Sequence, residues 1–434
     1  MPFRLPDERN EPNFEYRKGS LEHQKVQQEL QRLRAALPVQ SHVICEGQVQ
    51  STSESLGQVL PGEHGTVFTN YPLASRKQVE HAISSMLAAK KEWEDTPFVD
   101  RASVFLKAAE LVAGKYRHQL IAATMLGQGK NVWQAEIDAA AELADFFRLH
   151  CNYAAEIMSR QPQRGSDGMW TRVEYRPLEG FVYAVSPFNF TALGGSLVSA
   201  PALMGNVVLW KPSQYNVYAS MLVYQILLEA GLPPGVIQFV PGDAAKVTET
   251  VLSHRDFAGL NFVGSSDVFR KIYARIGEGI VNKTYREFPR VIGETSGKNF
   301  HLLHPPPIYP VPSTIQFVAH SNIRDKSVAL LQGSTYLNLA PMSVAAITMG
   351  SPDGDLGAFM GPVIQKDSFN KIKSIIDASK NDSSVELVAG GTYDGSVGYY
   401  VYPTVYRVSS PDHNLMNQEI FGPVLAVYVY EDSE

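Results

Sequence analysis

Two polar side chains, Asn189 and Lys211, follow consecutive apolar runs of this sequence and could form a chemical site. The run before Asn189, Phe181 to Val185, is rich in β-forming residues and predicts a buried strand. The next run, Asn206 to Trp210, predicts a second strand that ends at Lys211. In strand–helix–strand units, ligands collect at the carboxyl ends of the strands. We therefore expect the amide donor of Asn189 and the cation of Lys211 to share one cleft.

A carboxylate, Glu294, is the third candidate. In the run VIGETSGKNF it follows a short apolar stretch and precedes Ser296-Gly297, so that it could enter a cleft as a general base. Each of the three residues also has a structural explanation. An asparagine after a proline is typical of a turn, a lysine at a strand end is usually a solvated cap, and a glutamate near a glycine is usually structural or solvated. Their combination favours a site.

A possible anion site lies at Gly264-Ser265, where a predicted strand turns into a predicted helix. Backbone N–H groups at a helix start favour an anion such as a pyrophosphate. The turn is not the GxGxxG fingerprint, and a glycine there often serves the turn alone.

These segments resemble the aldehyde dehydrogenase superfamily. The residues that carry the resemblance are SPFNF, APALMGNVVLWKPS, the FxGS-like turn at Gly264 and ETSGKNF, where Ser296 stands for the first glycine of the family's E-x-GGKN. The resemblance implies an α/β fold, with a parallel Rossmann-type NAD-binding domain and an α/β catalytic domain. It implies NAD as the hydride acceptor. A thiolate nucleophile, oxyanion donors and a water-activating carboxylate complete that chemistry.

Roles for individual residues follow from the same resemblance. Asn189 would donate to the oxyanion, and Glu294 would activate the hydrolytic water. The resemblance assigns the cofactor to Lys211, Ser213, Gly264, Ser265, Glu419 and Phe421, and the substrate to Ser186 and Glu142.

Three functions are compatible with these motifs. The helix QAEIDAAAELADFFR and the SPFNF loop favour the branch of the superfamily that oxidises L-glutamate 5-semialdehyde to L-glutamate in proline degradation. A general fatty or aromatic aldehyde dehydrogenase fits less well, since such members usually carry a tryptophan before the asparagine. The remaining alternative is a catalytically dead relative that binds a nucleotide or a partner.

The nucleophile is missing. The resemblance places a cysteine in a G-Q-K-C run after the glutamate, but the only cysteines are Cys45 and Cys151. Between His304 and Ala346 the family resemblance is lost. Read one nucleotide earlier with free wobble bases, the codons of residues 318–336 can spell RGAFEYQGQKCSALSRLYV, the family's nucleophile segment. We infer that this stretch is translated out of frame, and expect the chain as written to be inactive. We also expect residues 305–341 to lack packed structure, because a shifted frame has no selected apolar period.

Length and composition limit the remaining possibilities. A chain of 434 residues is too long for one core. We expect a helical region and NAD-binding domain at 1–297, with an oligomerisation hairpin near 160–177, and a partial catalytic domain at 298–434 with an aberrant segment at 305–345. Family members continue beyond the point where this chain stops, and that part carries their oligomer arm. A net charge of −6 provides no basic face for nucleic acid.

Partners and location follow mainly from the resemblance. We expect a small aldehyde substrate and a homo-oligomer as in the family, and neither a membrane span nor a metal site. The resemblance implies the mitochondrial matrix, although the N-terminus does not read as a transit peptide.

The elements that would position these residues are a series of amphipathic helices followed by alternating strands and helices. The alternation predicts a parallel sheet with crossover helices. The helices are expected at 21–37, 75–93, 99–123, 131–150, 191–204, 219–230, 252–260 and 267–276, and the strands at 172–175, 181–185, 206–210, 236–240 and 261–263.

Overall fold

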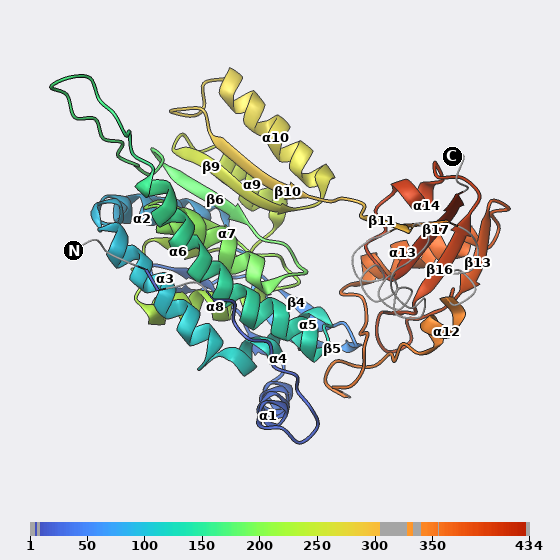
Figure 1. Ribbon diagram of the computed structural model, residues 1–434. Coiled ribbons are helices and arrows are strands. Elements are labelled where there is room, and N and C mark those ends of the chain that lie inside the picture. The colour runs from blue at the N-terminus through green and yellow to red at the C-terminus, as the bar shows by residue number, and fades with distance from the viewer. Residues whose placement is uncertain (1–4, 7–8, 304–327, 333–339, 355, 431–434) are drawn as a thin grey trace. The chain divides into compact units, whose positions relative to one another are not determined.

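The computed structural model describes residues 5–6, 9–303, 328–332, 340–354 and 356–430 (Figure 1). The chain divides into two compact units. Unit 1 comprises Met1–Gln58, Val67–Gly127 and Val132–Thr295, and unit 2 comprises Val59–Thr66, Gln128–Asn131 and Ser296–Glu434.

Unit 1 is built on a seven-stranded sheet whose first five strands are parallel. Their order differs from their order along the chain, because crossover helices connect parallel strands. Two short antiparallel strands from the N-terminal region extend the sheet beyond β8. From one edge to the other the strands are β10 (Arg290–Thr295), β9 (Phe257–Gly264), β6 (Phe181–Val185), β7 (Val207–Lys211), β8 (Ile237–Phe239), β2 (Val43–Cys45) and β3 (Gln48–Gln50).

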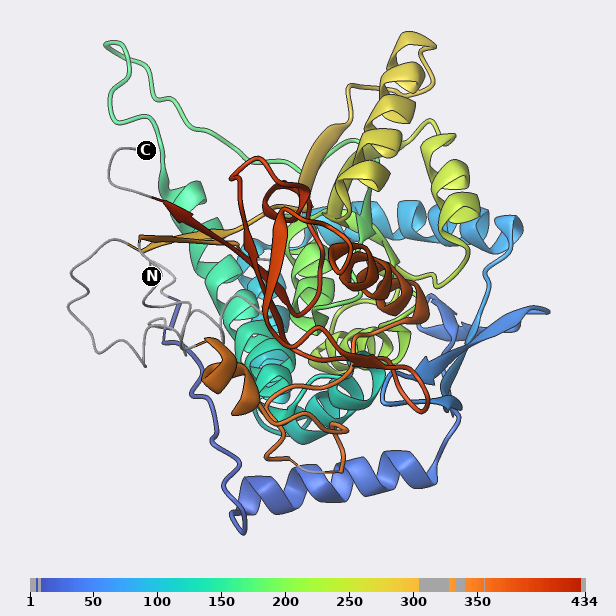
Figure 2. The same cartoon turned by 90° about the vertical axis from the view of Figure 1, so that its right-hand side faces the viewer.

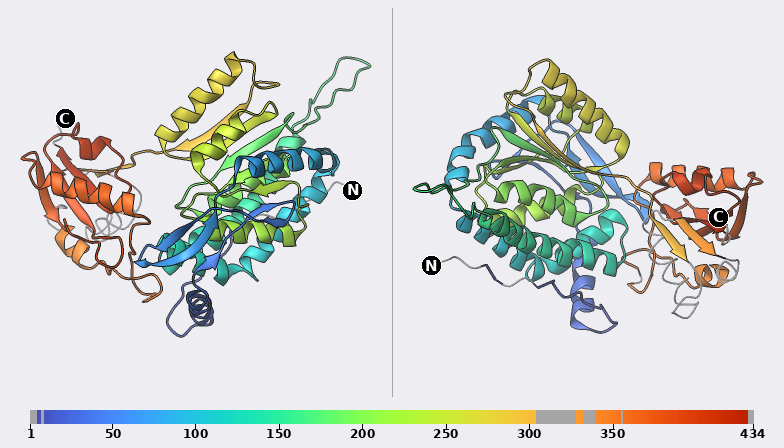
Figure 3. Two further views of the ribbon diagram at one scale, coloured as in Figure 1. Left: turned by 180° about the vertical axis from the view of Figure 1, so that it is seen from behind. Right: turned by 45° about the horizontal axis from the view of Figure 1, so that its top comes forward.

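Helices cover both faces of this sheet (Figure 3). The predicted parallel sheet between two helical layers is therefore confirmed. On one face, called face A here, lie α2 (Arg76–Asp95), α9 (Ala244–Leu252) and α10 (Ser266–Val281). On the other, face B, lies α7 (Thr191–Leu203), backed by α3 (Phe98–Ala113), α6 (Leu143–Ser159) and α8 (Val217–Ala230).

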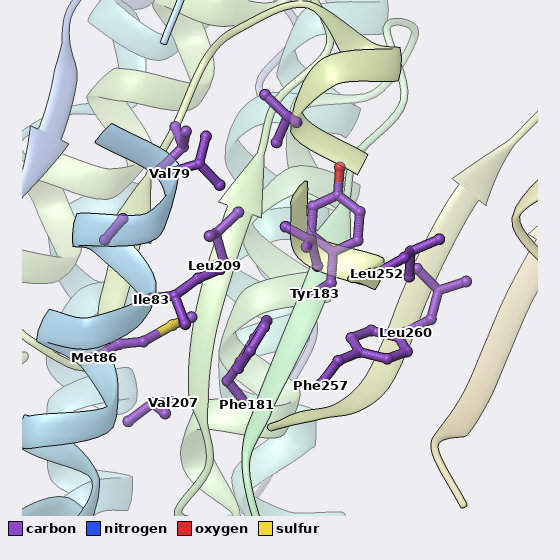
Figure 4. Packing of buried hydrophobic residues seen from close by; sticks show 14 of the residues in the cluster. Val79, Ile83, Met86, Phe181, Tyr183, Val207, Leu209, Leu252, Phe257 and Leu260 are labelled. Carbon is purple, nitrogen blue, oxygen red and sulfur yellow. The ribbon is translucent and has the colours of Figure 1, made fainter. Parts of the chain in front are cut away.

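The core of face A joins α2 to the middle of the sheet (Figure 4). Val79, Ile83 and Met86 recur at the spacing of one helical stripe and are buried. They pack with Leu209 and Phe181, which come from neighbouring strands. Ser75 begins α2 with a capping box shared with Gln78, so the helix start predicted at this serine is confirmed.

The helical layer behind face B contains a π-helical turn. The segment predicted as one helix at 99–123 is two helices, because the backbone leaves helical geometry at Gly114. The helix predicted at 131–150 exists, but its first half is not α-helical throughout. It comprises α5 (Val132–Ala135), the π-helix η1 (Glu136–Glu142) and α6, and it follows α4 (Arg117–Gln128).

Smaller elements complete unit 1. Helix α1 (Leu21–Ala35) lies where the apolar spacing predicts it, and β1 (Val39–Gln40), β5 (Glu63–Pro72) and β4 (Ser55–Leu60) form a three-stranded sheet. Two of the boundaries between the units along the chain, after Gln58 and after Thr66, fall within strand β4 and strand β5.

An extended arm follows α6 at residues 160–177, and Figure 2 shows it projecting beyond that helix. The strand predicted at 172–175 is wrong, because these residues have no ladder partner. The side chain of Gln161 alone holds the backbone of Val173. Trp170 on the arm is 83% exposed.

Two further boundaries differ from the prediction. The helix expected at 252–260 lies earlier, at α9, where the Asp243 side chain caps it by accepting the Lys246 amide hydrogen. Residues 257–260 belong to β9, and Phe257 and Leu260 both reach the face A core because the strand register shifts between them.

Within its described residues, unit 2 contains a mixed five-stranded sheet and three short to medium helices. Its order is β11 (Phe300–Leu303), β12 (Val328–Gln332), β17 (Val424–Tyr430), β16 (Thr404–Val408) and β13 (Val385–Ala389), with β14 (Tyr393–Asp394) and β15 (Tyr400–Val401) as a separate pair. The helices are α12 (Ala340–Ala345), α13 (Lys366–Ser379) and α14 (Asn414–Asn417).

One expectation about the aberrant segment is wrong in part. Val328–Gln332 forms β12, which pairs in parallel with both β11 and β17. The sequence VALLQ is apolar enough to form a central parallel strand whatever its origin. Residues 304–327 and 333–339 lie outside the described residues.

Candidate active site

Three predicted site residues, Lys211, Gly264 and Glu294, lie at the carboxyl ends of strands in the sheet of unit 1. Val185 at the end of β6 stands opposite Lys211 on β7 and opposite Phe262 on β9. Glu294 on β10 stands opposite Val263. Adjacent strands lie about 4.8 Å apart, so the Cα atoms of Lys211 and Phe262, two strands apart, are separated by roughly 10 Å.

The strand register also decides which face each side chain meets. Residues directly opposite one another share a face, and successive residues alternate. Lys211 and Phe262 therefore share face A, and Gly264, two residues later, lies on the same face. Glu294 is opposite Val263 and thus belongs to face B, the face that α7 covers.

Lys211 is a buried cation at this edge. The residue is 7% exposed, and among the described residues its ammonium group makes no hydrogen bond or ion pair. Burial lowers the pKa of Lys211 to about 8, and the Asp243 carboxylate partly opposes this. An ammonium group held without an acceptor is costly, so the position is suited to a ligand that supplies one.

The loop that carries Asn189 begins at Ser186, and two hydrogen bonds hold this first residue in place. The Ser186 hydroxyl accepts a hydrogen bond from Trp210 Nε1 at 3.0 Å, and the Ser186 amide donates to the Lys211 carbonyl at 3.3 Å. Ser186 is 3% exposed; its substrate role stays a prediction. Asn189 is half-buried, and within the described part of the chain its side chain makes no hydrogen bond. Its amide group is available as a donor.

The turn after β9 has the geometry of an anion-binding helix start. Ser265 caps α10, and its hydroxyl accepts the Val268 amide hydrogen at 3.3 Å. A Cβ on Gly264 would meet the Phe262 ring at 2.7 Å, which favours glycine in this turn. Ser213, beyond Lys211, is half-buried and accepts the Tyr215 amide hydrogen through its hydroxyl. Their cofactor roles stay predictions.

Both candidate carboxylates lie on described elements of unit 1. Glu294 is exposed on β10, where a water molecule can reach it. Glu142 closes the π-helix η1 and is half-buried. π-Helical turns occur frequently at functional sites.

In unit 2, the segment predicted to hold the nicotinamide ribose is braced by two lysines. Lys298 donates to the Gln418 carbonyl at 3.0 Å, and Lys371 donates to the Glu419 carbonyl at 2.9 Å. Burial lowers the pKa of Lys298 to about 8, with the Glu419 carboxylate opposing the shift. Phe421 has a φ of 61°, a strained conformation for a bulky residue.

Sequence reasoning missed several residues of this region. Trp210 was assigned only to a strand, although its indole fixes Ser186. Lys298 belongs to the motif ETSGKNF, but nothing in the sequence around it predicts its hydrogen bond to the Gln418 carbonyl. Asp138 accepts the amide hydrogens of α7, and no local pattern indicates so distant a partner.

Neither cysteine can act as the nucleophile where it lies. Cys151 is fully buried on α6 with its Sγ 3.7 Å from the Ala102 carbonyl, and burial raises the pKa of its thiol to about 12. Burial also raises the pKa of Cys45 to about 11. A thiol reacts as its thiolate, so both are inert.

Two further classes of site were sought in the described part of the chain. No group of three or more His, Cys, Asp or Glu side chains there could hold a metal ion. None of the helices described is long and apolar enough to cross a membrane.

Comparison with known proteins places this arrangement in a family. The sequence profile of the aldehyde dehydrogenase family matches residues 49–306 and 327–434. The chain therefore belongs to the aldehyde dehydrogenase family. The match is interrupted at residues 307–326, inside the stretch that does not resemble the family, and it resumes earlier than Ala346.

Among its relatives are several that share one name. The chain is 49% identical to the mitochondrial delta-1-pyrroline-5-carboxylate dehydrogenase of Emericella nidulans, over 99% of this chain and 76% of that protein. It is 41% identical to the corresponding mitochondrial protein of Homo sapiens, over 98% and 76%.

Solved structures agree with this. The delta-pyrroline-5-carboxylate dehydrogenase of Mycobacterium tuberculosis bound with NAD superposes with a TM-score of 0.93 at 36% identity, over 100% of this chain and 80% of that one. The 1-pyrroline-5-carboxylate dehydrogenase from Thermus with bound NAD gives 0.88 at 26%, over 99% and 83%. The predicted fold class is confirmed.

Proposed function

We propose that this chain is a delta-1-pyrroline-5-carboxylate dehydrogenase by descent, built for the NAD-dependent oxidation of L-glutamate 5-semialdehyde to L-glutamate in proline degradation. The chain as written lacks the nucleophile and does not turn over. The observation that carries the proposal is the carboxyl edge of the sheet, where Lys211 and Gly264 share face A while Glu294 lies on face B.

The residues on face A fit NAD. Lys211 is a buried cation without an acceptor among the described residues, and a ribose hydroxyl would supply one. The amide groups at the start of α10, next to Gly264 and Ser265, favour a pyrophosphate. Ser213 lies two residues beyond Lys211. For Glu419 and Phe421, which belong to unit 2, the family resemblance alone suggests a role toward the nicotinamide ribose. NAD, when bound, supplies the acceptor for the hydride.

Glu294 on face B and the remaining candidate residues fit the other steps of the chemistry. The Asn189 side chain would donate its amide hydrogen to the oxyanion that forms when the aldehyde carbon becomes tetrahedral. Glu294 would take a proton from the water that releases the acid. Glu142 and Ser186 would orient the substrate. The attacking thiolate is the one part that this chain does not provide.

A titration of the purified chain with NAD tests the cofactor assignment. We expect binding by the wild type, at least tenfold weaker binding by Lys211→Met, and no change in Lys91→Met. Lys91 is the matched control, because it is exposed on α2 and pairs with Asp95. Absence of binding by the wild type, or equal binding by Lys211→Met, would contradict the assignment.

For the missing nucleophile we propose a shift of reading frame between His304 and Ala346. The interruption of the family match at residues 307–326 supports it. The test is the nucleotide sequence of the transcript. A G-Q-K-C codon run one base out of frame, with the cysteine codon straddling Ser327 and Val328, is expected. If no single-base shift yields that run, the frameshift is wrong and the catalytically dead relative becomes the better explanation.

Assembly and location are further parts of the proposal. We propose that the arm at 160–177 serves a homo-oligomer, since its exposed Trp170 and Met169 suit contact with another chain. Mitochondrial relatives support the mitochondrial matrix. Sedimentation of a Trp170→Ser variant, which should dissociate more readily than the wild type, tests the first part.

A further inference from the structure

We propose that Asp138 is a positioning residue that fixes the Asn189 loop by capping α7 from another helix. The proposal rests on the proposed function of Asn189 as the oxyanion donor. Asp138 Oδ2 accepts the Thr191 amide hydrogen at 2.9 Å, and Oδ1 accepts that of Ala192 at 2.8 Å. These are the first two residues of α7.

The helix start needs this partner. The first amide groups of a helix have no acceptor within the helix, and the residue at the cap position, Phe190, offers no side-chain oxygen. The Thr191 hydroxyl is already bonded to that of Thr124 at 2.9 Å. Asp138 is 1% exposed, and Thr191 is fully buried, so water does not substitute. A carboxylate there also complements the helix dipole.

Asn189 lies two residues before this anchor. Its own side chain makes no hydrogen bond in the described part of the chain, so the backbone on either side fixes its position. On one side Ser186 is held by Trp210 and by the Lys211 carbonyl. On the other side Asp138 holds Thr191 and Ala192. An oxyanion donor stabilises its transition state only when it is held in place beforehand.

The segment η1 makes buried hydrogen bonds in two directions. Glu136 and Asp138 are two residues apart in η1, which in a helix places them on nearly opposite sides, about 200° apart at α-helical spacing. Glu136 faces Arg117 and Tyr16, whereas Asp138 faces α7. The π turn thus connects the N-terminal segment to the Asn189 loop.

The test follows backbone amide exchange and the Asn189 side-chain amide signal by NMR in isotope-labelled chain. In Asp138→Ala we expect at least tenfold faster exchange of the Thr191 and Ala192 amides and a displaced Asn189 Nδ2 signal. Asp138→Asn keeps one carbonyl oxygen and should restore one of the two amide bonds. If Asp138→Ala does not fold, Asp138→Asn provides the test. The amide whose hydrogen bond is not restored should then exchange faster, and the Asn189 Nδ2 signal should be displaced.

Asp145→Asn is the matched control. Asp145 lies on the next helix and also accepts a backbone amide hydrogen, from Glu11 at 2.8 Å, but among the described residues it makes no hydrogen bond to α7. It should leave Thr191, Ala192 and Asn189 unchanged. An Asn189 signal at its wild-type position in both Asp138 variants, or one displaced equally by Asp145→Asn, would overturn the positioning role. NAD titration of the same samples separates this result from the proposed function, since Asp138 variants should bind NAD as the wild type does.

Discussion

At the residue scale, Lys211 illustrates how a proposed binding position costs stability. Its ammonium group is buried without an acceptor among the described residues, and burial lowers its pKa from 10.5 to about 8. Below pH 8 the folded protein holds a buried charge that the unfolded chain solvates. Between pH 8 and 10.5 only the unfolded chain keeps that proton, so the cost disappears as the pH rises.

Lys211→Met should therefore be more stable than the wild type at pH 7, by on the order of 2–3 kcal/mol. Its free energy of unfolding should lack the rise that the wild type shows between pH 8 and 10.5. Urea denaturation of both proteins across this pH range measures the difference. Equal stabilities at pH 7 would show that the ammonium group is solvated.

A second prediction about the pH dependence of stability concerns His150. It stacks on Phe146 and lies 3.4 Å from the Ser199 hydroxyl, and burial lowers its pKa from 6.5 to about 4. Only the unfolded chain takes up the proton between these values, so the stability that neutral His150 provides above pH 6.5 is lost as the pH falls through this window.

The replacement His150→Phe should reduce the loss of stability between pH 7 and pH 5 by about 2 kcal/mol. His81→Gln, at an exposed position of α2, is the control and should follow the wild type. Denaturation curves at the two pH values give the comparison. Parallel curves for wild type and His150→Phe would contradict the prediction.

The sequence pattern predicted the candidate site residues that lie at strand ends. It did not predict the residues that hold their backbone in place through hydrogen bonds. Asn189 and Lys211 follow apolar runs, and the carboxyl-edge rule brings them to one edge. Asp138 and Lys298 act through contacts with residues 53 and 120 positions away. Such pairs depend on how helices pack, which no local spacing encodes.

At the element scale, the π-helix η1 is anchored by a buried ion-pair network. The Arg117 guanidinium contacts Glu136 and Glu11, and both Arg117 and Glu136 are 1% exposed. The Phe14 ring lies 3.9 Å from the same guanidinium, and the Tyr16 hydroxyl donates to Glu136 at 2.6 Å. This network attaches the N-terminal segment to α4 and η1.

Arg117→Met leaves the Glu136 carboxylate buried without its cation and should cost about 3–5 kcal/mol of stability. The exposed pair of Arg270 with Asp267 is the control, and Arg270→Met should cost less than about 1 kcal/mol. Chemical denaturation measures both. A loss below 1 kcal/mol for Arg117→Met would mean that Glu136 is solvated in the variant.

Element types were predictable where a pattern is long, as in α1, α2 and the strands β6 and β7. The prediction failed at α9, because the signal is a single capping residue, Asp243, rather than a long apolar period. It failed at 172–175, because β-forming residues make a strand only when another strand pairs with them. The π turn in η1 was not predicted, because its sequence EIDAAAE consists largely of residues that also favour an α-helix.

At the scale of the whole molecule, we propose that the chain keeps the cofactor and base positions of its family without the nucleophile. The family profile covers residues on both sides of 307–326, and the only cysteines, Cys45 and Cys151, are buried as thiols. Beside the interruption, Val328–Gln332 forms β12 and pairs with β11 and β17, but supplies no cysteine.

The most direct measurement mixes the purified 434-residue chain, at a concentration comparable to the substrate, with NAD and glutamate semialdehyde, and follows NADH in the first turnover. A Cys151→Ala variant is the control for the buried thiol. We expect NAD binding without any burst of NADH in either protein, because no thiolate is available to attack the aldehyde. A burst of one NADH per chain in the wild type would contradict this and show that another group serves as the nucleophile.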